Sequence, residues 1–277
     1  MSRTIKFALN HMTAPGFSVP DFLKLAQKTG CYGVELRNDL QDKQLSQKPF
    51  FDGMKPRQVG DMARDMGLRL LGLSEAYGFN DWSETMADRV KLLIEQAAEA
   101  GAETISLIPL NQGSEETLEV RQAKLVRALE PILQMLEGTA LVALIEPLGF
   151  PSCSLRMKQE AITAIAAIQG EARFKLVHDS FHHYLAQEVN YFPQQTGIVH
   201  ISGVVDEMVQ REDMQDAHRI LVDAEDRLEN ILQIRALLDL GYDGAFSFEP
   251  FSAKVHALNN VSETITTSMR FIRDRLY

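Results

Sequence analysis

Short apolar runs alternate with longer segments of helical periodicity along the whole chain. Eight runs have the length of β-strands, and in the segments between them apolar residues recur at the spacing of an amphipathic helix. Several helical segments end at a glycine just before the next run. The predicted strands are 5–10, 32–37, 68–76, 103–110, 140–148, 173–179, 198–203 and 245–251. The predicted helices are 19–29, 55–67, 84–101, 115–138, 158–170, 184–197, 227–244 and 261–276.

This alternation predicts a (β/α)₈ TIM barrel, an α/β fold. Eight strand–helix units of about 35 residues each match the repeat that such a barrel needs. The strands are almost continuously apolar, as parallel strands buried on both faces are. A doubly wound open sheet is the alternative, but it usually carries a glycine-rich phosphate loop after its first strand, and the segment ALNHMTAPG contains none. With no interdomain linker in sight, we expect one domain over residues 1–277.

The composition is ordinary for a globular enzyme, and the net charge argues against a nucleic-acid partner. Apolar residues make up 45% of the chain and charged residues 24%, and the net charge is −10. An acidic surface repels phosphate backbones, so a nucleic acid is not expected as a partner. The two cysteines, Cys31 and Cys153, stand far apart and in no spacing typical of metal ligands.

The same features indicate where the protein works. Two isolated cysteines are typical of a reducing compartment. The N-terminal segment has no apolar core of a signal peptide, and no run approaches the ~18 apolar residues of a membrane span. We therefore expect a cytoplasmic protein without membrane contact. The sequence neither requires nor excludes a homo-oligomer.

Lone polar side chains end four consecutive predicted strands, the fifth to the eighth. They are Glu146, Asp179, His200 and Glu249. Because catalytic groups of a TIM barrel come from the carboxyl ends of its strands, we expect the four to converge on the barrel axis. A single strand-end glutamate is more often a solvated rim residue, but four at the same end argue against that explanation.

Three carboxylates and one imidazole suit one divalent cation such as Mn²⁺, Co²⁺, Mg²⁺ or Zn²⁺. Without a cation the carboxylates would repel one another and their pKa values would rise. The sequence therefore predicts a metal site formed by these four residues.

Other polar and aromatic residues near the strand ends are candidates for substrate contacts. His182 lies three residues after Asp179, where it either binds substrate or a metal ligand, or faces solvent at the start of a helix. We expect His183 to point elsewhere. The remaining candidates near the first three strand ends are Asn10, His11, Glu35, Arg37, Phe79 and Trp82. Salt bridges at the rim explain Glu35 and Arg37 equally well, and plain packing explains the aromatic residues.

Taken together, Glu146, the D-x-x-H motif of Asp179 and His182, His200, and Glu249 in SFEPF resemble the xylose isomerase-like TIM-barrel superfamily. That group includes sugar isomerases and epimerases, inosose isomerases and dehydratases, and endonuclease IV. The resemblance covers essentially the whole chain. The region from HISGVVDEM to GYDGAFSFEPF is most similar to 2-keto-myo-inositol isomerases of inositol catabolism.

The resemblance implies roles for individual residues. Arg219 stands where many relatives have an arginine that is followed by a Pro-Gly-x-Gly stretch, but here ILVDAED replaces the glycine-rich part. Glu146 and Glu249 would move a proton at the carbon next to a carbonyl, in addition to holding the cation. Arg219 and His182 would contact substrate oxygens.

The resemblance thus implies a metal-dependent isomerase or epimerase of a keto-polyol or ketose, with an inosose as the best single substrate. An inosose dehydratase on the same scaffold is the first alternative. An endonuclease IV-like enzyme would need further metal ligands. The pair Asp216 and His218 could supply them, although the third and fourth strand ends contain no histidine. An intact set of four ligands argues against a binding protein without catalytic activity.

Overall fold

Every predicted strand is present in the computed structural model, which describes residues 5–113 and 116–277. The strands are β1 (Lys6–Asn10), β2 (Gly33–Arg37), β3 (Arg69–Tyr77), β4 (Thr104–Ile108), β5 (Val142–Ile145), β6 (Phe174–Asp179), β7 (Thr196–Ile201) and β8 (Ala245–Phe248). The α-helices are α1 (Val19–Lys28), α2 (Pro56–Asp65), α3 (Glu84–Ala100), α4 (Leu118–Met135), α5 (Lys158–Ala167), α6 (Ser180–Ala186), α7 (Asn230–Asp239), α8 (Ala253–His256) and α9 (Val261–Leu276). Short 3₁₀ helices are η1 (His11–Thr13), η2 (Phe50–Gly53), η3 (Arg211–Asp213) and η4 (Asp216–His218).

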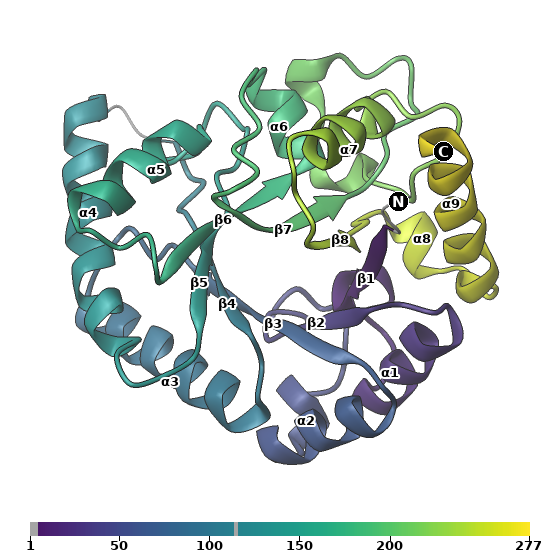
Figure 1. Cartoon of the computed structure of the whole chain (residues 1–277), viewed down its shortest axis with the longest axis horizontal. Coiled ribbons are helices and arrows are strands. Elements are labelled where there is room, and N and C mark those ends of the chain that lie inside the picture. Colours follow the sequence, from purple (N-terminus) through teal and green to yellow (C-terminus); the bar gives the residue numbers. More distant parts are fainter. Residues whose placement is uncertain (1–4, 114–115) are drawn as a thin grey trace.

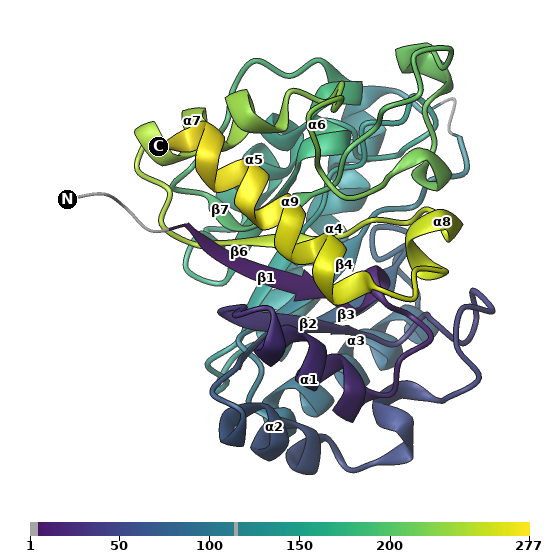
Figure 2. The ribbon, with the colours of Figure 1, turned by 90° about the vertical axis from the view of Figure 1, so that its right-hand side faces the viewer.

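The strands pair in chain order, all parallel, and β8 closes the sheet against β1 (Figure 1). The helices form an outer ring around this barrel. Figure 2 shows α9 lying over the outside of β1. The Arg273 guanidinium of α9 is 5.1 Å from the centre of the Phe7 ring of β1. The predicted (β/α)₈ barrel is confirmed, and the open doubly wound sheet is excluded.

Alternating side chains of the strands fill two separate apolar regions. In β1, Phe7 and Leu9 pack outward into the main core between strands and helices, whereas Ala8 belongs to a small aliphatic cluster with Leu144 and Ile198. Burying one large apolar side chain contributes about 1.5–3 kcal/mol, so this layered packing supplies much of the stability. The carboxyl ends of the strands are left for polar groups.

The sixth helix differs from the prediction of 184–197. It begins directly after β6, because the Asp179 side chain accepts hydrogen bonds from the backbone nitrogens of Phe181 and His182 and thereby caps the helix. It ends at Ala186, since Gln187 adopts a left-handed conformation with a φ of 54°. The chain from Glu188 to β7 is irregular, so the apparent helical periodicity there was misleading.

Two other helices are shorter than predicted by several residues at both ends. The helix expected over 115–138 begins at Leu118, after the N-cap Thr117, and Glu115 itself lies outside the described residues. The helix expected over 227–244 spans Asn230–Asp239. Within the described segments, no helix combines the length and the apolar character needed to cross a bilayer.

Helices α2 and α3 approach each other so closely at Gly60 that a side chain has no room. A Cβ atom built there would lie 1.8 Å from the carbonyl oxygen of Ala100. Although alanine is intrinsically the better helix former by about 1 kcal/mol, we expect Gly60→Ala to lower the free energy of unfolding by about 1–3 kcal/mol, measured by urea denaturation. Gly16→Ala, with nothing within 4 Å, is the matched control and should change stability little. A midpoint for Gly60→Ala at or above the wild-type value would contradict this packing.

Candidate metal centre and pocket

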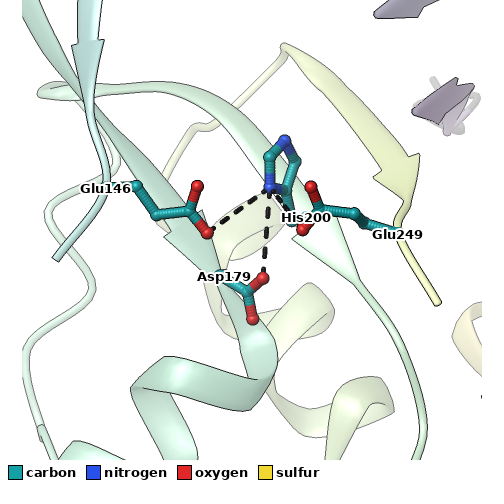
Figure 3. Close-up of side chains that lie close together, drawn as sticks. All are labelled: Glu146, Asp179, His200 and Glu249. Atoms are coloured by element: carbon teal, nitrogen blue, oxygen red, sulfur yellow. Dashed lines mark ion pairs between the residues drawn. The ribbon is translucent and has the colours of Figure 1, made fainter. Parts of the chain in front are cut away.

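Four strand ends bring three carboxylates and one imidazole together at the barrel mouth. Glu146 follows β5, Asp179 ends β6, His200 lies in β7, and Glu249 follows β8. One ligand-capable atom from each lies within 4.8 Å of the others. Figure 3 shows the four side chains close together, with the three carboxylates around the His200 ring. All four side chains are buried, with at most 5% of any residue exposed. The predicted convergence is therefore present in the structure.

The backbone explains why these side chains meet. Asp179 and His200 are direct partners in the β6–β7 register. The backbone nitrogens of Glu146 and Glu249 each donate to the preceding strand in the barrel, to Leu107 and Ile201 respectively. Both glutamates also precede a proline, which favours an extended conformation for the residue before it. The two glutamates are thus held at the strand ends in similar ways.

Asp179 serves the fold and the site at once. Its Oδ1 accepts from the backbone nitrogen of Phe181 at 2.7 Å and from that of His182 at 3.2 Å, which caps α6. Its Oδ2 accepts from Nη2 of Arg219 at 2.6 Å. The carboxylate therefore has little freedom to turn away from the site.

His200 provides the test of whether a cation fits here. Its Nε2 lies 3.1 Å from Oε2 of Glu35, so the Nε2 proton is donated to that carboxylate. Its buried Nδ1 has no hydrogen-bond partner among the described residues. Yet Nδ1 lies 3.1 Å from Oε2 of Glu249, 3.7 Å from Oε1 of Glu146 and 4.0 Å from Oδ2 of Asp179. Once it has lost its proton, such a nitrogen can share a divalent cation with the three carboxylate oxygens that it faces.

The charges of the protein alone leave the site strained electrostatically. Burial raises the pKa of Glu146 to about 7, against the opposing effect of His200. Burial would also raise the pKa of Glu249, but His200 and two arginines outweigh it and lower this pKa. Burial would lower the pKa of His200, but the surrounding carboxylates raise it well above its ordinary value. A cation at Nδ1 would relieve the repulsion among the carboxylates.

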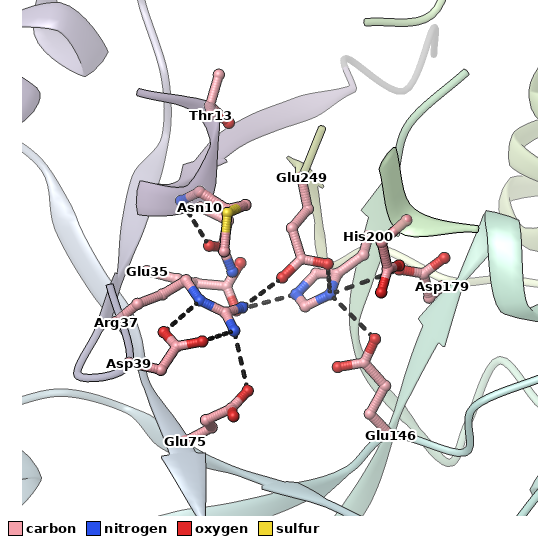
Figure 4. A network of polar contacts seen from close by, with 12 residues as sticks. Asn10, Thr13, Glu35, Arg37, Asp39, Glu75, Glu146, Asp179, His200 and Glu249 are labelled. Carbon is pink, nitrogen blue, oxygen red and sulfur yellow. Dashed lines mark hydrogen bonds and ion pairs between the residues drawn. The ribbon is translucent and has the colours of Figure 1, made fainter. Parts of the chain in front are cut away.

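A second layer of charged groups extends from Glu249 toward β2 and β3 (Figure 4). Arg37 donates from Nη1 to Oε1 of Glu249 at 2.7 Å, and from Nε and Nη2 to both oxygens of Asp39. Its Nη2 also donates to Oε2 of Glu75 at 2.9 Å. Arg37 is buried and bonds to three carboxylates, so it does not form the solvent-exposed salt bridge at the rim that the sequence allowed. Glu75 and Asp39 were missed, although Glu75 sits near the end of its strand as the four site residues do.

Arg219 lies on the other side of Glu249. Its guanidinium carbon is 5.0 Å from the centre of the Phe181 ring and 4.5 Å from that of Phe251, so the cation contacts both aromatic rings. Besides Asp179, its Nη2 donates to Oε2 of Glu249 at 3.1 Å. The side chain is 1% exposed and therefore fixed in position.

The segment ILVDAED keeps the loop after β7 ordered without a glycine-rich stretch. Gly203 and Ile220 exchange two backbone hydrogen bonds of 2.7 Å. The Asp226 carboxylate accepts from the backbone nitrogens of Val204, Leu228 and Asn230. This local network fixes the loop next to Arg219.

Glu146, Asp179, His200 and Glu249 are called the four-residue group below. A pocket of about 250 Å³ opens beside this group. Glu146 and Glu249 line it, as do His182 and Arg219. His182 is buried between the edges of Phe150 and Phe181, burial lowers its pKa, and its Nδ1 has no hydrogen-bond partner among the described residues. The alternative of a solvent-facing His182 is thereby excluded.

Not all candidates reach this pocket. His11 stacks on Phe22 and lies 3.2 Å through Nε2 from the Phe17 carbonyl oxygen. Trp82 packs against the main core. Glu35 contacts His200 rather than the pocket lining. Their assignment as substrate contacts stays an untested prediction that this geometry does not favour.

Four further residues also lie apart from the group formed by Glu146, Asp179, His200 and Glu249. Phe79 is part of the main core, and His183 is buried beside Lys158, away from the pocket lining. Near Arg219, His218 accepts through Nδ1 from the backbone of its own turn, and Asp216 bonds to Arg219. Over the described ranges, the four-residue group is the one cluster found that could hold a metal.

The barrel fold and the four-residue group are the features to compare with known proteins. The chain belongs to the xylose isomerase-like TIM barrel family, whose model matches residues 23–275. None of the curated proteins matches the sequence.

Solved structures resemble the chain over its full length. A xylose isomerase domain-containing protein from Salmonella typhimurium LT2 is 29% identical, with a TM-score of 0.85 over 100% of this chain and 99% of that one. The IolI protein, solved with a zinc atom, is 18% identical, with a TM-score of 0.83 over 98% of both chains. D-psicose 3-epimerase from Clostridium cellulolyticum H10 is 13% identical, with a TM-score of 0.74 over 98% and 99%. The last two likenesses establish the fold.

Glu35 should tune metal affinity through His200. Glu35→Gln keeps the side-chain shape but replaces the charged acceptor of the Nε2 proton, and such outer partners are typically worth about 10–100-fold in metal affinity. We expect that loss in a competition titration with a metal chelator. Glu188→Gln, a change at a buried glutamate paired with Lys158 outside the pocket lining, is the matched control and should retain wild-type affinity. Unchanged affinity in Glu35→Gln would contradict the role of this contact.

Proposed function

We propose that the protein is a divalent-metal-dependent isomerase or epimerase of a keto-polyol or ketose, with 2-keto-myo-inositol of inositol catabolism as its substrate. The observation that carries the proposal is the unpartnered Nδ1 of His200, which faces three carboxylates beside a small polar pocket. The zinc atom of the related IolI protein and the epimerase activity named for D-psicose 3-epimerase support it.

Glu146, Asp179, His200 and Glu249 would hold the cation. When bound, a divalent cation polarises the carbonyl and hydroxyl oxygens of a keto-polyol and stabilises the negative charge that develops on them. The remaining chemistry falls to the side chains of the chain itself, which must orient the substrate and move one proton.

Glu146 and Glu249 approach His200 from two sides and both line the pocket. We assign them the transfer of the proton next to the carbonyl, through an enediolate of the substrate. They are unequal, because both oxygens of Glu249 accept hydrogen bonds from arginines whereas no arginine bonds to Glu146 among the described residues. We therefore assign the first proton abstraction to Glu146.

His182 and Arg219 would orient the substrate. Both line the pocket, and the buried His182 imidazole is neutral because burial lowers its pKa. A neutral imidazole can donate to one substrate oxygen and accept from another. Arg219, fixed between two aromatic rings, would donate to a carbonyl or hydroxyl oxygen.

An inosose dehydratase would use the same residues to expel a hydroxyl group, so it remains the alternative that an experiment must separate. The endonuclease IV-like alternative has no comparable support. Asp216 and His218 are engaged in contacts of their own, and the net charge of −10 opposes DNA binding.

Incubation with 2-keto-myo-inositol in D₂O tests the chemistry. We expect deuterium at the carbon next to the carbonyl and a product of otherwise unchanged mass, detected by NMR and mass spectrometry. Glu146→Gln and Glu249→Gln should each slow the exchange ~10²–10⁴-fold, because each removes a positioned acid–base group. Loss of one water from the product would instead identify a dehydratase. Isomerisation without solvent deuterium in the wild type would refute proton transfer through the two glutamates.

Metal content tests the proposed site directly. Asp179→Asn keeps the Oδ1 cap of α6 but removes the negative charge, so we expect most of the metal to be lost while the circular dichroism spectrum is retained. His182→Ala, a change in the pocket outside the four-residue group, should keep full metal content while turnover falls. Full metal content in Asp179→Asn would remove Asp179 from the site, and an empty site in His182→Ala would indicate a different set of ligands.

A further inference from the structure

Glu75 is held rigidly at the β3 edge of the pocket. Its backbone nitrogen donates to Oδ1 of Asn38 at 2.8 Å, and its carbonyl oxygen accepts from Nδ2 of the same residue at 3.1 Å. Its carboxylate is anchored through Oε2, which accepts from Arg37 at 2.9 Å. Only 10% of the side chain is exposed. Asn38 holds its backbone and Arg37 holds its carboxylate, so the position of Glu75 is defined at both ends.

The other carboxylate oxygen has nothing to bind within the chain. Oε1 of Glu75 accepts no hydrogen bond from any residue of the described segments, and it is not sealed off as a buried unpaired atom. Glu75 lines the same pocket as Glu146 and Glu249. A fixed carboxylate oxygen without a partner, on a residue that lines a pocket, can accept a hydrogen bond from a hydroxyl group of a ligand.

A donor lies on the same face of β3. Tyr77, two residues after Glu75, also lines the pocket, and its hydroxyl oxygen accepts from the backbone nitrogen of Asn111 at 3.1 Å. That contact leaves the phenolic hydrogen without an acceptor in the described part of the chain. The Glu75 carboxylate can accept a hydrogen bond from one hydroxyl group of a ligand, and the Tyr77 hydroxyl group can donate a hydrogen bond to a neighbouring one.

The charges of the pocket favour an uncharged ligand. Each of its three cationic side chains is already paired with carboxylates: Arg37 with Asp39, Glu75 and Glu249; Lys43 with Asp39; and Arg219 with Asp179, Asp216 and Glu249. A phosphate group would therefore find no unpaired cation and would meet the Glu75 carboxylate. An uncharged hydroxyl group needs no cation.

We propose that Glu75 determines substrate specificity: its free carboxylate oxygen accepts a hydroxyl group of an unphosphorylated polyol, on the β2–β3 side of the pocket. Figure 4 shows Glu75 joined through Arg37 to Glu249, which links this acceptor to the four-residue group. The inference rests on the proposed function, because it assumes that a polyol binds in this pocket.

Calorimetric titration of the metal-loaded protein tests this role. The probes are myo-inositol, its monodeoxy analogues and an inositol monophosphate. In Glu75→Gln the amide oxygen faces Arg37, which turns the amide nitrogen toward the pocket and replaces the acceptor by a donor. We expect the Kd of myo-inositol to rise about tenfold or more, the loss typical of a hydrogen bond to a charged group. One monodeoxy analogue should bind the wild type and Glu75→Gln equally, since the lost hydroxyl and the lost acceptor are the same interaction.

Asp39→Asn is the matched control. It disturbs Arg37 on the side away from the pocket, because Asp39 holds the same guanidinium but does not line the pocket. We expect its Kd for myo-inositol to stay within about threefold of the wild-type value, below the loss of a full charged hydrogen bond. An equal loss in both variants, or equal losses for all analogues, would show that Glu75 acts only by supporting Arg37 and would overturn the proposal. So would tight binding of inositol monophosphate, or no binding of myo-inositol to the wild type.

The solvent-exchange assay separates this proposal from the proposed function. Suppose that 2-keto-myo-inositol shows no solvent exchange, but that one monodeoxy analogue binds the wild type and Glu75→Gln equally while the others bind the variant more weakly. In that case the proposed reaction fails and the acceptor role of Glu75 stands. If exchange occurs but Glu75→Gln binds every analogue like the wild type, the acceptor role fails and the proposed reaction stands.

Discussion

Three carboxylates crowd around one imidazole nitrogen at the barrel mouth, and the rest of the site holds this negative charge in place. Like charges so close together, away from water, repel strongly. The chain opposes that repulsion with two buried arginines, Arg37 and Arg219, which meet at Glu249 from opposite sides. Neither guanidinium bonds to Nδ1 of His200, so the nitrogen still faces the carboxylates without a partner.

Buried ion pairs of this kind contribute little net stability, because desolvation offsets most of the attraction between the charges. Their value here is geometric. Asp179 caps α6, bonds to Arg219 and faces His200, so the same carboxylate sets a helix boundary and a site position. A change that loosens the cap would therefore also displace a side chain of the site.

The sequence was sufficient for the barrel and for the residues of the four-residue group, because both follow from local periodicity. Strand ends share one edge, so a lone polar residue after each apolar run is enough to predict convergence. The Arg37 network was not predictable in this way, since Arg37 and Glu249 are separated by 212 positions and nothing local signals their contact. The predicted start of α6 at residue 184 was wrong, because Asp179 was interpreted only as a metal ligand and not as the N-cap of a helix that begins at Ser180. His11 and Trp82 follow strands as the site residues do, but their side chains pack elsewhere.

The pocket has two walls, which come from different strands of the barrel. Strands β5 to β8 supply the four-residue group, whereas β2 and β3 supply Arg37 and Glu75, which take no part in that group. Because Arg37 bonds to both Glu75 and Glu249, the side chains of β2 and β3 are positioned by the four-residue group but can change without altering that group. A family that keeps one metal chemistry while varying its substrates would be expected to vary this second wall. On that reasoning, differences among relatives at the positions of Glu75 and Tyr77 should follow the pattern of substrate hydroxyl groups, while the ends of β5 to β8 stay constant.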